Sequence, residues 1–128
     1  MSLATILAVF VGGFFGAALR YALSAPLNAR AAAERAMFPW GTLFVNSTGA
    51  FGFGVVSALV VDPLLRQALL TGFMGAYTTF STLMLEIDTR LRGGRLWAAI
   101  FYAVVSFVGG PFWVALGKIF TDVFIPTV

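Results

Sequence analysis

Four runs of apolar residues, each long enough to cross a lipid bilayer, take up nearly the whole chain. A transmembrane helix needs about 20 such residues, and the runs cover roughly residues 3–27, 41–61, 64–91 and 96–120. Only 10% of the 128 residues are charged, whereas a typical soluble domain has about 25%. The sequence therefore predicts an all-α membrane protein, with a single four-span domain over residues 1–128 that crosses a cell membrane several times.

The first run lacks the basic start and the small-residue cleavage site of a signal peptide, so we expect it to be a retained transmembrane helix. Gly12 and Gly16 lie four residues apart in this run, a spacing that lets another helix approach closely. We expect the helix to end near Pro26 and Asn28, before a polar interfacial segment that continues to Trp40. The first span should therefore pack tightly on a neighbour and stop at the first loop.

The chain has no cysteine and no histidine. Thiol chemistry is thereby excluded, and the commonest metal ligand and proton shuttle is missing. The net charge of +3 comes from loop arginines, and contact with anionic lipid explains it better than any nucleic-acid signature. We therefore expect a protein that is not an enzyme and whose surroundings are a lipid membrane, with no nucleic-acid partner.

Basic residues are unevenly divided between the two ends of the predicted bundle. The loops after the first and third spans share one side, and cytoplasmic loops usually carry the excess of lysine and arginine. Five basic residues lie on that side and two on the other: Arg30, Arg35, Arg90, Arg92 and Arg95 against Arg66 and Lys118. The bias predicts that both termini face outside.

The stretch GAYTTFST, residues 75–82, places a glycine and five hydroxyl side chains inside the third apolar run. Non-helical backbone survives in a membrane only where protein buries it or where it lines an aqueous path. Hydroxyl groups that bond to the preceding helical turn would explain any single one of these residues. Together they favour a break in the third helix beside a lined pathway.

Other polar side chains fall inside the second and fourth runs. Asn46 lies in the second run, and Thr42, one turn earlier, faces the same direction. A carboxamide in a membrane must be paired, so Asn46 is either a functional group or the partner in an interhelical hydrogen bond. Tyr102, Ser106 and Gly110 follow one another at intervals of four residues, a sparse stripe that ordinary packing would also explain.

Charged residues within the spans are few. Arg20, late in the first run, either extends to the interface or offers positive potential to an anion. Glu86 and Asp88 are expected to be hydrated and paired with loop arginines, and no carboxylate lies unambiguously in mid-span, so a proton-coupled exchanger lacks its usual carrier. Hydroxyl and amide donors, with the positive edges of phenylalanine rings, suit a small anion.

Two motifs at their mutual spacing resemble those of the CrcB/Fluc fluoride channels: GTLFVN at residues 41–46 and TGFMGAYTTFST at residues 71–82. With GAALR in the first span, the resemblance covers essentially the whole chain. It implies an antiparallel dimer of four-helix subunits in a bacterial plasma or inner membrane, which exports fluoride passively through two pores. It also implies a structural sodium ion (Na+) at the dimer interface, held by backbone carbonyl groups where the third helix breaks.

The resemblance further implies roles for individual residues. Asn46 would donate a hydrogen bond to fluoride, and Phe80 would offer it a ring edge. Gly75 and Thr78 would supply the carbonyl groups that bind sodium. The remaining pore positions would form or support the polar track and the vestibule: Thr42, Thr79, Ser81, Tyr102, Ser106 and Arg20.

Two positions depart from the family pattern. Leu83 stands where a second phenylalanine is common, and Gly110 stands where a third hydroxyl is expected. Either the pore tolerates an apolar wall, or a partner subunit supplies those groups. These departures, with the bias of basic residues, leave open a heterodimer of two homologous chains, but a homodimer is preferred because the other pore residues are retained.

Two other classes of protein share the small size and the four spans. A small multidrug-type antiporter would need an acidic residue in the first span, and this chain has none there. A non-transporting membrane subunit of a larger complex is the second alternative. Anion flux from the purified protein separates all three.

Overall fold

The computed structural model describes residues 2–34, 36 and 38–125; Arg35, counted above among the basic residues of the first loop, lies outside them. The described residues form helices and short connections: α1 (Leu3–Ala33), α2 (Trp40–Leu59), α3 (Pro63–Arg66), the π-helix η1 (Gln67–Met74), α4 (Gly75–Tyr77), α5 (Phe80–Arg92) and α6 (Leu96–Phe124). Four stretches are long and apolar enough to cross a membrane, namely α1, α2, the run from α3 to α5, and α6. The prediction of an all-helical, four-span protein is confirmed.

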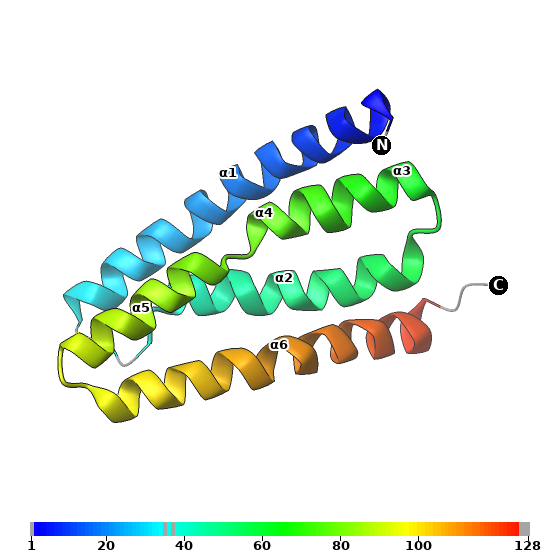
Figure 1. The fold of residues 1–128 in the computed structure, drawn as a ribbon. Coiled ribbons are helices and arrows are strands. Elements are labelled where there is room, and N and C mark those ends of the chain that lie inside the picture. Colours follow the sequence, from blue (N-terminus) through cyan, green and yellow to red (C-terminus); the bar gives the residue numbers. More distant parts are fainter. Residues whose placement is uncertain (1, 35, 37, 126–128) are drawn as a thin grey trace.

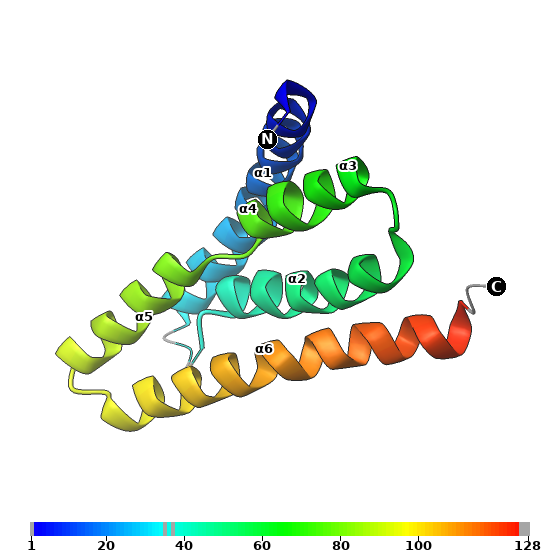
Figure 2. The same cartoon turned by 45° about the vertical axis from the view of Figure 1, so that its right-hand side comes forward.

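The four spans form an elongated bundle with both ends of the chain at the same end (Figure 1). Helices α2 and α6 run side by side, whereas α1 is steeply inclined to them and packs against η1 and α4 (Figure 2). Large apolar side chains such as Phe10, Phe14, Trp97 and Phe124 are exposed along the long helices. Such a surface is expected of a multi-pass protein whose solvent is lipid.

The predicted end of the first span is wrong, because α1 continues through Pro26 to Ala33. A proline within a helix removes one backbone hydrogen bond but does not always end the helix. Alanine, the strongest helix former, fills the last turn. Arg30 also pairs with Glu34 one turn later, at 2.8 Å, an arrangement that supports a helix.

Glycine lets the spans approach one another at backbone distance. A methyl group on Gly12 would overlap the carbonyl oxygen of Ala68 in η1, and one on Gly16 would overlap that of Phe73. The close approach predicted from the spacing of these two glycines is therefore confirmed. Glycines pack α2 against α6 in the same way. These contacts hold α1 against η1, which leads into α4 and the short connection to α5, and they hold α2 against α6.

Candidate functional site

Two residues with extended backbone, Thr78 (φ −81°, ψ 160°) and Thr79 (φ −145°, ψ 119°), connect α4 to α5. We call them the link. The Thr78 amide and hydroxyl both donate to the Met74 carbonyl, each at 3.0 Å. The Thr79 hydroxyl caps α5 by accepting from the Thr82 amide at 3.3 Å. The other polar groups of the link need partners from outside these helices.

Asn46 of α2 pairs with both backbone polar groups of Thr79. Its Oδ1 accepts from the Thr79 amide at 2.8 Å, and its Nδ2 donates to the Thr79 carbonyl at 3.1 Å. In an uninterrupted helix the Thr79 amide would donate to the Gly75 carbonyl instead. The carboxamide therefore replaces helical hydrogen bonds, and Nδ2 has a second N–H with which to donate.

Arg20 of α1 approaches the link from another side. Its Nη1 donates to the Thr78 carbonyl at 3.2 Å, and the contact is partly buried. The guanidinium thus lies at the C-terminal end of α4, where helix carbonyl groups concentrate partial negative charge. The sequence offered two interpretations of Arg20, and neither included a backbone carbonyl as its partner.

A groove of about 380 Å³ opens beside the link, and we call it the link groove. Five predicted site residues line it together: Asn46, Thr79, Phe80 and Ser106 of the expected pore, and Thr78 of the expected sodium site. Phe80 is 63% exposed, and its ring stands edge-on to that of Phe107 with centroids 6.3 Å apart. The Ser106 Oγ is buried near the Tyr102 hydroxyl, which lies one helical turn earlier. The groove therefore has a serine in its wall beside an exposed ring.

Both departures from the family pattern, Leu83 and Gly110, also line the link groove. The Leu83 side chain is buried, whereas a methyl group on Gly110 would meet no atom within 4 Å. A smaller cavity of about 40 Å³ is lined by these two residues together with Asn46 and Ser106. The place of the expected third hydroxyl is thus open space.

The Glu86 carboxylate differs from expectation, because its partners are neutral donors from three other helices. Thr42 donates to Oε1 at 2.7 Å, the Tyr102 hydroxyl donates to Oε2 at 2.8 Å, and Asn28 Nδ2 lies 3.4 Å from Oε1. Thr42 and Tyr102 are 1% and 0% exposed. These four residues form what we call the Glu86 cluster. Asp88, by contrast, pairs with Arg92 at 2.7 Å, as expected.

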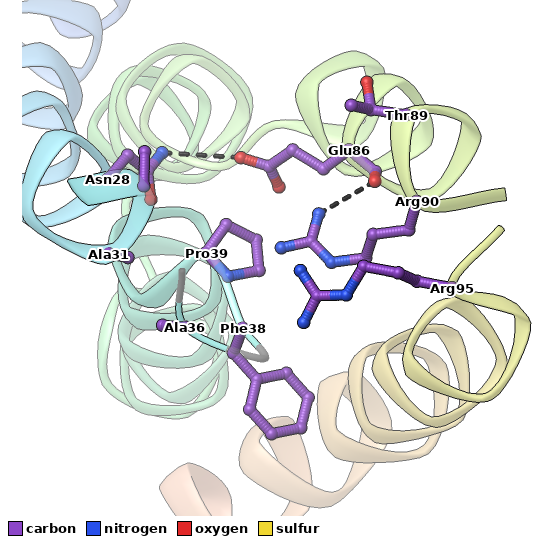
Figure 3. A pocket seen from close by; sticks show the side chains of 10 residues that line it. Asn28, Ala31, Ala36, Phe38, Pro39, Glu86, Thr89, Arg90 and Arg95 are labelled. Carbon is purple, nitrogen blue, oxygen red and sulfur yellow. Dashed lines mark hydrogen bonds between the residues drawn. The ribbon is translucent and has the colours of Figure 1, made fainter. Parts of the chain in front are cut away.

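A cavity of about 690 Å³ opens beside the Glu86 cluster. Figure 3 shows the guanidinium groups of Arg90 and Arg95 pointing into the space between Glu86 and Phe38. Arg90 Nη1 also donates to the Glu86 backbone carbonyl at 2.8 Å. We call this cavity at the loop end of the bundle the mouth. Its two arginines give it positive charge, which raises the local concentration of anions.

The predicted site residues thus separate into two neighbouring groups. Thr42 and Tyr102 belong to the Glu86 cluster, and each lies one helical turn from a residue of the link groove. Ser81 is exposed at the start of α5, with its Oγ 3.4 Å from that of Thr79. Sequence reasoning missed Glu86 and Asn28. Helical spacing carried a signal for Glu86, which lies three residues after Leu83 and so shares its face of α5.

Residues 7–118 match the family model described as "CrcB-like protein, Camphor Resistance (CrcB)". The chain is similar to "Fluoride-specific ion channel FluC 1" of Staphylococcus aureus (strain NCTC 8325 / PS 47), with 42% identity over 107 residues, 80% of this chain and 84% of the relative. It is also similar to "Fluoride-specific ion channel FluC" of Prosthecochloris aestuarii (strain DSM 271 / SK 413), with 39% identity over 117 residues, 88% of each chain. The matched residues include the link, its groove and the Glu86 cluster. The chain therefore belongs to the CrcB family of membrane proteins.

Proposed function

We propose that this chain is a fluoride-selective channel that lets fluoride leave the cell passively. The link groove carries the proposal: the second N–H of Asn46, the exposed ring of Phe80 and Ser106 line one space. Neutral donors and ring edges stabilise a small anion while leaving it free to move on. The names of the two relatives support fluoride as that anion.

The charges around the groove support the same substrate class. None of the described residues that line it is acidic, and the cavity at the loop end is lined by Arg90 and Arg95 against the single carboxylate of Glu86. An anion would be drawn to this mouth by the arginines and would then exchange water for the donors of the groove. A cation would meet the opposite field at the mouth.

We further propose that the channel is an antiparallel dimer with two pores. The link groove is open, and Phe80 is 63% exposed although it is a large apolar ring. A second copy laid across this face would close the groove and bury the ring. A homologous partner chain that supplies the groups missing at Leu83 and Gly110 is the alternative assembly.

The family also implies a structural sodium ion at the dimer interface, and the link fits such an ion. Hard cations prefer oxygen ligands, and the Gly75 carbonyl lacks its helical donor because the Thr79 amide bonds to Asn46. The Thr78 carbonyl accepts from Arg20 and retains a second lone pair. The family resemblance implies that the Gly75 and Thr78 carbonyl groups are the ligands; among the described residues no cluster of acidic, histidine or cysteine side chains could hold a metal.

Two rival functions are distinguished by one experiment. The purified chain is reconstituted alone into liposomes loaded with potassium fluoride, and fluoride release is followed with an electrode. A passive channel releases fluoride rapidly only when valinomycin lets potassium follow. Release that instead depends on a proton gradient would indicate an antiporter, with Glu86 as the obvious carrier. No release would indicate either a non-transporting subunit or a chain that needs a homologous partner.

Adding a homologous second chain separates a non-transporting subunit from a chain that needs a partner, and cross-linking reports how the subunits are oriented. A conducting antiparallel homodimer would exclude the obligate pair. An inactive chain inserted in a single orientation, which gains fluoride flux when a homologous second chain is added, would replace the homodimer with a heterodimer. A chain that stays inactive with every such partner would contradict the proposed function.

A further inference from the structure

We propose that Arg20 is a positioning residue whose guanidinium holds the link open from within one subunit and so sets the position of Phe80 at the groove. The flux measurements that test this proposal rest on the proposed function, because they take the chain to be a fluoride channel. The structural part of the proposal, the control of the link by Arg20, stands on the hydrogen bond to the Thr78 carbonyl.

The sequence of α1 delivers the guanidinium to the link. Gly12, Gly16 and Arg20 follow one another at intervals of four residues and therefore share one face of the helix. The two glycines press this face against the backbone of η1. The next position along the same face reaches the point where α4 ends, and there Arg20 meets Thr78.

The link needs this partner because an uninterrupted helix is the competing structure. A helix would satisfy every backbone group of residues 75–82 locally, and it would return the Thr79 amide to the Gly75 carbonyl. Side chains stabilise the extended link instead: Asn46 pairs with both backbone groups of Thr79, and Arg20 takes the Thr78 carbonyl. Without Arg20 this carbonyl would be unpaired in a low-dielectric setting.

Electrostatics favour a cation at this place. The guanidinium lies at the carboxyl end of α4, where it interacts favourably with the helix dipole. The guanidinium donates to one lone pair of the Thr78 carbonyl oxygen, and the second lone pair can still accept another partner. The link can therefore keep its shape before a partner chain or a free cation is added, and Phe80, the residue that follows it, starts α5 in a fixed position.

The test measures amide hydrogen exchange by mass spectrometry on the full-length protein in detergent, with peptides that cover residues 78–83. Arg20→Met removes the donors but keeps an unbranched apolar chain, and Arg20→Lys keeps a charged donor of similar reach. Arg66→Met, an exposed arginine of α3, is the matched loss of charge. We expect Arg20→Met to raise exchange in the link by about threefold or more, because its hydrogen bonds open more often. Arg20→Lys should restore most of the protection, and Arg66→Met should change nothing.

Fluoride release from liposomes is measured on the same proteins. We expect Arg20→Met to slow it by about tenfold, with Arg20→Lys close to the wild type. Slower release with unchanged exchange in the link would overturn the proposal, since Arg20 would then act through its charge on the anion. A rise in exchange spread equally over α1 and η1 would overturn it too, because the effect would be general loosening. If the wild-type chain alone releases no fluoride, the proposed function is tested with a homologous partner chain, and the exchange data alone decide the role of Arg20.

Discussion

The link and the Glu86 cluster both place polar groups within the membrane-spanning helices. The two regions complete the hydrogen bonds of these groups in different ways. In the link, side chains of Asn46 and Arg20 replace helical partners of the backbone. In the cluster, three side chains donate to one carboxylate. A lost side chain therefore leaves backbone groups unpaired in the link. In the cluster the loss of one donor leaves the carboxylate with two others, and only the loss of Asn28 also removes a backbone partner, that of the Thr42 amide.

The two regions also differ in what they leave unpaired. The carboxylate oxygens of Glu86 both have donors, and Thr42 and Tyr102 are almost completely buried. The link groove instead leaves Phe80 exposed and the second N–H of Asn46 free to donate. In the proposed function the groove would accept an anion, while the cluster would stabilise the fold beside it. Four substitutions test this contrast, in order of expected effect.

Asn46→Leu should have the largest effect. It leaves the Thr79 amide and carbonyl unpaired, and each such buried group costs about 1–3 kcal/mol. If about 3 kcal/mol appears in the barrier, fluoride release falls about 100-fold. The control is Asn28→Leu, which removes from the Glu86 cluster a side chain that donates to Glu86 and to the Thr42 hydroxyl and accepts from the Thr42 amide, and which leaves the link untouched. Equal losses in the two variants, measured in liposomes, would remove the contrast between the regions.

Glu86 tests the cluster through stability. Glu86→Leu leaves the Thr42 and Tyr102 hydroxyls without their acceptor, whereas Asn28 still donates to Thr42, and it should lower the free energy of unfolding by about 3 kcal/mol. Glu86→Gln keeps the shape and one acceptor oxygen, so it should cost about 1 kcal/mol. Unfolding in mixed detergent micelles measures both values. If the two variants were equally stable, the donors would not depend on this acceptor and the cluster would have no structural role.

Phe80→Ile tests the ring edge in the groove. Because the isoleucine side chain has no aromatic hydrogens to offer an anion, fluoride release should fall about tenfold, the equivalent of one weakened contact to a charged group. Dimer formation should survive. Phe112→Ile, at another exposed ring, is the matched control. Unchanged release from well-folded Phe80→Ile protein would show that the pore lies elsewhere.

Gly110→Ser should have the smallest effect. The added side chain meets open space, and serine is a better helix former than glycine by about 0.5 kcal/mol. The variant should therefore be slightly more stable, and the new hydroxyl in the groove should change fluoride release by less than about threefold. A large loss of stability would mean that the space beside Gly110 is filled, for example by a partner chain.

The sequence predicted the spans because length and hydropathy decide them, and the spacing of Gly12 and Gly16 predicted the tight packing of α1. It misplaced the end of α1, because a single proline was given more weight than the alanines and the Arg30–Glu34 pair that follow. Local composition marks a strong helix former or a breaker, but it does not say which prevails.

The sequence predicted which residues form the candidate site, but it did not predict their hydrogen-bond partners. Asn46, Phe80 and Ser106 were expected together and line one groove. The pairing of Asn46 with Thr79, and of Arg20 with Thr78, joins residues 33 and 58 positions apart. Only the packing of α1 and α2 around the link brings them together. Glu86 was assigned to water because it lies near a loop, whereas three helices converge on it.

The central claim is that this chain alone forms a pathway that selects fluoride, and its most direct test is the release of fluoride and chloride from the same liposomes. The vesicles carry at most about one copy of the proposed dimer each, which separates a channel from slow leakage. The account predicts that fluoride leaves every vesicle that holds protein while chloride stays inside, and that Asn46→Leu slows the release of fluoride about 100-fold. Equal release of the two anions, or fluoride release from Asn46→Leu at the wild-type rate, would contradict it.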